Sequence, residues 1–117
     1  MLLAYSHYKY IMASKEYLQY QYLAINPATS GDTTLVQRVP GKRIALVGIL
    51  AVADGEVAVT FKTDSGPISG EMSLIANSGF SIFNPGGVCV SRSGGPIIIN
   101  LSASIKVGLT ITYELKD

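Results

Sequence analysis

The chain has 117 residues, enough for one domain whose core needs neither disulfides nor metal. Nine Lys and Arg against eight Asp and Glu give a net charge of +1. These charges are scattered singly and form no basic stripe along which a phosphate backbone could bind, so we do not expect nucleic-acid binding. Hydrophobic residues make up 48% and charged residues 15% of the chain, compared with about 25% charged in an average domain. A surface with so few charged residues favours burial of apolar faces between subunits.

The chain starts with an apolar, tyrosine-rich stretch, MLLAYSHYKYIMASKEYLQYQYLAI, which lacks the basic start and clean aliphatic core of a signal peptide. We predict an arm over residues 1–16, either flexible or in contact with another subunit, and a single sandwich domain over 17–117. The sequence MASKEY, from Met12, is typical of a natural protein start. Residues 1–11 would then come from an upstream start, and would be either disordered or a tie between subunits.

Six of the seven tyrosines lie before Ala24. A tyrosine buries a large ring while its hydroxyl stays hydrated, which suits an interface. The interface candidates in this part of the chain are therefore Tyr5, Tyr8, Tyr10, Tyr17, Tyr20 and Tyr22. For Tyr17–Tyr22 a strand that caps the sandwich is an equally good explanation. The alternation of Tyr20 and Tyr22 favours strand over helix here.

The most apolar run lies between Arg43 and Ala53, and both of its faces are apolar. In a regular strand one face would hold Ile44, Leu46, Leu50 and Val52, and the other would hold Ala45, Val47, Ile49 and Ala51. A strand with two apolar faces lies inside a sandwich or against another subunit. Val47 and Ile49 therefore join the interface candidates.

Turn-forming residues divide the middle of the chain into short apolar runs. Asp54-Gly55 lies between two such runs and predicts a hairpin that pairs Arg43–Ala53 with Glu56–Thr63. Further turn signals are Ser65-Gly66-Pro67, Gly70, Asn77-Ser78-Gly79, Asn84-Pro85-Gly86-Gly87 and Ser93-Gly94-Gly95-Pro96. Eight or nine short strands, with a turn roughly every 8 to 12 residues, are typical of an all-β sandwich or barrel.

The end of the chain has the clearest pattern. From Ile97 to Leu115 every odd-numbered residue is apolar, and every even-numbered residue except Ile98 is polar or Gly. This alternation of period two predicts β-structure. One straight strand of this length would run roughly 63 Å at about 3.3 Å per residue, too long for a small domain. We therefore predict two strands, Pro96–Ala103 and Lys106–Leu115.

The sequence offers no catalytic, metal or cofactor site. His7, the single histidine, lies in YSHYKY, a poor place for a preorganised base. Cys89 lies in VCV as a small hydrophobe, and as the only cysteine it excludes an internal disulfide. Four acidic residues near turns match no calcium-loop spacing: Asp54, Glu56, Asp64 and Glu71. The longest apolar run, IALVGILAVA, is too short for a membrane helix of about 20 residues. We predict no enzymatic activity, no cofactor and no membrane partner.

Residues from about Pro40 to Leu115 resemble a family of small virion proteins of tailed bacteriophages. The apolar run into VTF, the NPGG turn and the closing stretch INLSASIKVGLTITY carry the resemblance. A further part is the spacing of Ser69, Gly70, Met72, Leu74, Ala76 and Gly79. The tyrosine-rich arm departs from the family pattern, so no role for it follows from the resemblance.

The resemblance implies an antiparallel, jelly-roll-like β-sandwich of about eight strands that forms a homotrimer. It would bind the major capsid protein on the outer capsid surface as a decoration or cement protein, and would be made in the host bacterial cytoplasm. The alternative is a tail- or spike-borne module that binds a receptor or glycan. That role would need exposed aromatic and polar groups on the loops, where the sequence offers Phe80 and Phe83 and no Trp.

Overall fold

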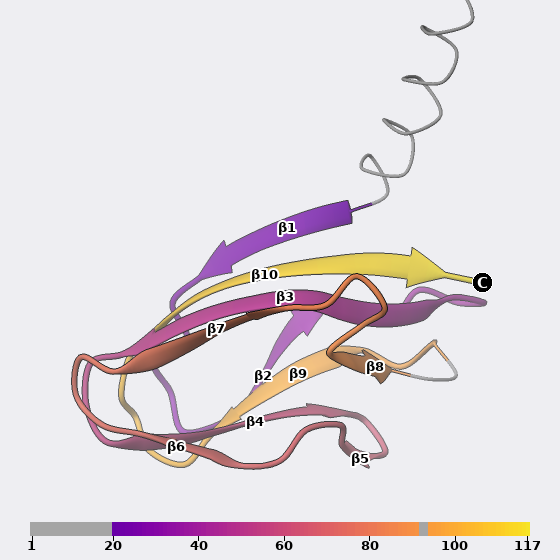
Figure 1. Cartoon of the computed structure of the whole chain (residues 1–117). Coiled ribbons are helices and arrows are strands. Elements are labelled where there is room, and N and C mark those ends of the chain that lie inside the picture. The colour runs from indigo at the N-terminus through magenta and orange to yellow at the C-terminus, as the bar shows by residue number, and fades with distance from the viewer. Residues whose placement is uncertain (1–19, 92–93) are drawn as a thin grey trace, which may run out of the picture.

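The computed structural model describes residues 20–91 and 94–117 as two stacked antiparallel sheets (Figure 1). The strands are β1 (Tyr20–Ile25), β2 (Gly31–Val36), β3 (Arg43–Ala53), β4 (Val57–Thr63), β5 (Gly66–Pro67), β6 (Met72–Leu74), β7 (Gly79–Phe83), β8 (Cys89–Ser91), β9 (Ile97–Leu101) and β10 (Val107–Lys116). The arm predicted over residues 1–16 lies outside the described residues, and so do Tyr5, Tyr8, Tyr10 and Tyr17.

The order of the strands defines a jelly roll. One sheet, here called the β3 sheet, has the order β1-β10-β3-β7, with β8 also paired to β3. The other, the β4 sheet, has the order β2-β9-β4-β5, with β6 also paired to β4. If β5 with β6 and β7 with β8 are each taken as one interrupted strand, the chain has eight strands. It alternates between the sheets at every step except from β4 to β5–β6, which lie in the same sheet. The predicted all-β, jelly-roll-like sandwich of about eight strands is confirmed.

The core lies between the sheets and is built from alternate residues. In β4 the buried side chains are Val57, Val59 and Phe61, and in β9 they are Ile97, Ile99 and Leu101. β10 adds Val107, Leu109 and Ile111 from the opposite sheet. The alternation read from Ile97 to Leu115 therefore marks core-facing positions, and the predicted division into two strands is confirmed. The two strands lie in different sheets.

An irregular pairing in β3 changes which of its residues face the core. Gly48 pairs with Thr112 and Leu46 with Tyr113, so Val47 is an extra residue between them. Because side chains alternate along a strand, one extra residue exchanges the two faces. Ile44 and Leu46 face the core before this bulge, and Ile49, Ala51 and Ala53 do so after it. The prediction that Ile44, Leu46, Leu50 and Val52 share one face is wrong for this reason.

The predicted hairpin through Asp54-Gly55 is also wrong. β3 and β4 lie in different sheets, and residues 54–56 cross from one sheet to the other. A two-residue hairpin turn of the favoured type needs a positive φ at both central residues, and Gly55 is not among the glycines that have one. The backbone at this corner bonds elsewhere: Ala53 N donates to Ser78 O, and Asp54 N donates to Lys106 O.

The start of β7 lies very close to β3. Gly79 pairs with Val52, and a Cβ atom at Gly79 would lie 1.8 Å from the carbonyl oxygen of Ala51. No side chain fits at that distance, because a backbone atom cannot move aside as a flexible side chain can. A glycine at position 79 is therefore required for β7 to approach β3 here.

We predict that Gly79→Ala destabilises the fold by about 1–3 kcal/mol, because it forces β7 away from β3. The matched control is Gly70→Ala, since a Cβ at Gly70 meets no atom within 4 Å and Gly70 has no positive φ. The control should change the free energy of unfolding by less than about 0.5 kcal/mol. Urea denaturation followed by circular dichroism measures both variants, and equal values would contradict the close approach.

Candidate binding surface

The described residues hold no arrangement of catalytic groups. No group of three or more His, Cys, Asp or Glu among residues 20–91 and 94–117 lies close enough together to hold a metal ion. His7 lies outside these residues. Cys89 is buried, and this burial raises the pKa of its thiol to about 11. A thiol with so high a pKa is a poor nucleophile at neutral pH. No helix in this part of the chain has the length and apolar character to cross a bilayer.

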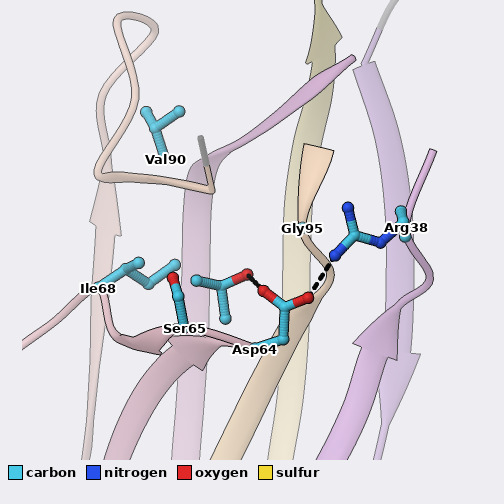
Figure 2. A pocket seen from close by; sticks show the side chains of 7 residues that line it. Arg38, Asp64, Ser65, Ile68, Val90 and Gly95 are labelled. Carbon is cyan, nitrogen blue, oxygen red and sulfur yellow. Dashed lines mark hydrogen bonds and ion pairs between the residues drawn. The ribbon is translucent and has the colours of Figure 1, made fainter. Parts of the chain in front are cut away.

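A polar hollow of about 410 Å³ at one end of the sandwich has all its main polar groups engaged (Figure 2). The Asp64 carboxylate forms an ion pair with Arg38. The buried hydroxyls of Thr63 and Ser91 lie 3.2 Å apart, and Ser91 Oγ donates to Gly95 O at 2.6 Å. These contacts hold the ends of β4 and β8 together. Thr63 Oγ1 also lies 3.4 Å from Asp64 Oδ1, but that carboxylate is already paired with Arg38, so we read this hollow as structural.

The outer face of the β3 sheet carries an exposed apolar patch. Its side chains and their exposed fractions are Tyr22 at 71%, Leu50 at 50%, Val52 at 48% and Phe83 at 60%. We call this set the outer patch. It crosses four strands, because Tyr22 pairs with Thr112, Thr112 with Gly48, and Gly48 with Phe83. Several apolar side chains gathered on one face are typical of a docking surface.

Gly48 shapes a shallow depression within the outer patch. The depression is about 170 Å³ and lies among Leu50, Phe83, Thr110 and Thr112. A Cβ at Gly48 would lie 3.2 Å from Phe83 Cδ1 and 3.4 Å from Thr112 Cβ. The missing side chain therefore leaves a hollow beside an exposed aromatic ring. A side chain of a partner could fill it.

The outer face of the β4 sheet is polar. Asp32 accepts hydrogen bonds from Lys62 Nζ at 3.1 Å and from Asn100 Nδ2 at 2.8 Å, across the three strands β2, β9 and β4. The hydrogen bond from Asn100 and then that from Lys62 hold the pKa of the Asp32 carboxyl below its usual value. The two outer faces of the sandwich thus differ in character, and the β3 sheet presents the one suited to apolar contacts.

A second apolar feature opens between the two sheets. A cleft of about 500 Å³ lies between β6 of one sheet and β7 of the other, two strands that do not pair with each other. Apolar side chains of both sheets line it, together with three serines and no charged residue. We call it the interlayer cleft. Its volume falls within the range of about 300–1,000 Å³ that is usual for ligand sites.

The structure describes four of the predicted interface residues, namely Tyr20, Tyr22, Val47 and Ile49. Tyr20 and Tyr22 lie on the edge strand β1, and Tyr22 belongs to the outer patch. Val47 and Ile49 are buried within the chain. Of the two, only Ile49 lines the interlayer cleft. The exposed apolar residues of β3 are Leu50 and Val52 instead.

Sequence reasoning missed Leu50, Val52 and Phe83 as surface residues. A glycine inside an apolar strand pattern is a known sign of a bulge. Gly48, next to the bulged residue Val47, is such a glycine. A bulge placed there would have exchanged the two faces of the second half of β3. Phe83 ends the edge strand β7, so its exposure follows from the register of that strand.

Comparisons with known proteins give weak structural likenesses. No protein-family model matches the sequence, and no curated protein matches it. A chain of Bacillus endospore appendages, described as disulfide-linked pili, is 14% identical with a TM-score of 0.49, over 84% of this chain and 88% of that chain. A chain of the cyanophage Pam1 capsid asymmetric unit is 9% identical with a TM-score of 0.45, over 81% of each. The coat protein of Tobacco streak virus is 11% identical with a TM-score of 0.39, over 82% and 86%.

These neighbours are structural proteins of capsids and pili. Their identities are below 25% and their TM-scores below 0.5, so they assign no role to this chain. The jelly roll is established by the chain's own strand order.

We predict that Cys89 reacts slowly with alkylating agents in the folded chain. A pKa of about 11, against the ordinary value of 9.0, lowers the thiolate fraction at pH 8 about 100-fold. Iodoacetamide should therefore modify the folded chain at least about 100-fold more slowly than the urea-unfolded chain, as followed by mass spectrometry. Similar rates in the two states would show that the thiol is accessible and ionised.

The same pKa shift predicts a pH dependence of stability. Because the unfolded chain loses its thiol proton first, the contribution of Cys89 is complete below pH 9 and is lost as the pH rises toward about 11. Cys89→Ala should therefore show a shallower loss of stability than the wild type between these pH values. Parallel slopes of the free energy of unfolding would contradict the raised pKa.

Proposed function

We propose that this chain is a non-enzymatic structural protein of a virion. In this role it is a decoration or cement protein that binds the major capsid protein on the outer capsid surface and stabilises the shell as a homotrimer. The observation that supports this proposal best is the outer patch on the β3 sheet, set against the polar outer face of the β4 sheet. A surface of this kind binds another protein and needs no nucleophile.

The size of the patch suits a contact that is repeated many times. Burying a large apolar side chain fully contributes about 1.5–3 kcal/mol. Four side chains that are about half to two-thirds exposed would then contribute on the order of 3–7 kcal/mol together. Association costs about 4–15 kcal/mol in lost freedom. One patch alone is thus marginal, and the symmetry of a trimer on a shell supplies the missing affinity through multivalency.

We predict that Leu50→Lys weakens binding to the capsid at least ten-fold, because it places a charge at the centre of the outer patch. The matched control is Thr34→Lys, on the exposed outer face of the β4 sheet. Co-sedimentation of each purified variant with capsids stripped of this chain measures the binding. Native mass spectrometry of the same samples reports whether the free chain is a trimer.

Equal binding by both variants would contradict a role of the outer patch. The number of copies per virion separates the proposal from its alternative. A cement protein covers the whole shell, whereas a tail- or spike-borne receptor-binding module is present in only a few copies. Quantitative mass spectrometry of purified virions against the major capsid protein gives this number.

A further inference from the structure

The interlayer cleft and the free edge of β7 form one continuous apolar site. Phe61 of β4 and Met72 of β6 line the cleft from one sheet, and Phe80 and Ile82 of β7 line it from the other. The Cys89 side chain also lines it. Because Ile82 is among the large hydrophobic residues that remain exposed, this site is incompletely covered by the chain's own residues.

We propose that the interlayer cleft of one copy binds the N-terminal segment 1–13 of a second copy, which adds as a strand along the free edge of β7. This inference rests on the proposed self-association of the chain and names the contact that would produce it. It is separate from the outer patch, which we assign to the capsid.

The edge of β7 is open to such an addition. β7 pairs with β3 on one side and, within the described residues, with no strand on the other. Its sequence, GFSIF, has no charge and no proline, the two devices by which proteins usually protect an edge strand. The backbone groups along this edge can therefore pair with an incoming strand, while alternate side chains of that strand enter the cleft.

The N-terminal segment has the matching chemistry. All its residues except Ser6, His7 and Lys9 are apolar or aromatic. In an extended strand Tyr8, Tyr10 and Met12 would project to one side, and His7, Lys9 and Ile11 to the other. The first side carries no charge and suits an apolar cleft, whereas the second carries the charged Lys9 and suits the side away from the cleft.

The position of β1 favours exchange between copies over binding within one copy. β1 and β7 are the opposite edges of the β3 sheet (Figure 1). They lie three strand spacings apart, about 14 Å at roughly 4.8 Å each. Residues 14–19 span at most about 20 Å. A segment bound to its own cleft would have to cross the outer face and turn round β7 within that reach. The β7 edge of a neighbouring copy needs no such detour.

Cys89 provides a direct test, because it lines the cleft and is the only cysteine in the chain. In the full-length Y8C variant, prolonged mild oxidation should link position 8 of one copy to Cys89 of the next. The reaction will be slow, because the raised pKa of the Cys89 thiol leaves little thiolate, so rates are compared between variants. We expect a covalent dimer and higher species on a non-reducing gel. The matched control is K9C, on the opposite side of the proposed strand, which should cross-link at least five-fold more slowly. The Y8C/C89A double variant should not cross-link through the cleft.

Other patterns would overturn the proposal. Cross-linking that persists in the double variant would show contact between two N-terminal segments. A disulfide within one chain would place the segment in its own cleft. Equal rates for Y8C and K9C would contradict a strand with a cleft-facing side.

A second measurement tests the cleft without cysteines. Ile82→Lys places a charge in the cleft, whereas Ile75→Lys places it at another exposed apolar residue that does not line the cleft. Native mass spectrometry should show that I82K self-associates at least ten-fold more weakly than the wild type, whereas I75K self-associates as the wild type does. If I82K self-associates normally but L50K no longer binds the capsid, the proposed contact between segment 1–13 and the cleft is wrong and the proposed function stands. If a small apolar molecule remains bound to the wild type and is lost from I82K with no change in association, a ligand occupies the cleft instead.

Discussion

The pairing of β3 with β10, with Val47 as one extra residue, is the constraint on which the other features depend. It places Ile44 and Leu46 in the core before the bulge and Ile49 and Ala51 in the core after it. Without the extra residue, a one-residue shift would move half of these side chains to the surface. The bulge also turns Leu50 and Val52 outward, beside Gly48. A single irregularity thus completes the core and creates the most apolar part of the outer surface.

Much of the fold follows from the sequence, because the alternation of period two reports burial directly. The strands Val57–Thr63, Ile97–Leu101 and Val107–Lys116 are visible in this way, and so is the jelly-roll-like class. The alternation does not show which strand pairs with which. Asp54-Gly55 has the composition of a hairpin turn, but the chain crosses between sheets there because β10 and β7 take both edges of β3. The residues of a turn do not show which strands, distant in the sequence, will pair with the strands on either side of it.

The candidate surfaces were harder to predict than the fold. Tyr22 is exposed, as the preference of tyrosine for interfaces suggests, whereas the prediction of Val47 and Ile49 rests on an alternation that the bulge interrupts. The interlayer cleft has no local signal, since its walls come from β4, β6, β7 and the start of β8. A single apolar sequence pattern therefore marks both the core and the binding surfaces. Only the register of the strands separates the two.

The strand order has a consequence for how the chain is made. β3 lies between β10 and β7, and β1 pairs with β10, so the strands synthesised early await partners that are synthesised much later. Neither the β3 sheet nor its edge at β1 can form until β10 has left the ribosome. Reliance on distant pairings makes folding slow, on the millisecond-to-second scale typical of such sandwiches. Until then the apolar strand β3 is exposed, and rapid, abundant synthesis favours aggregation over folding.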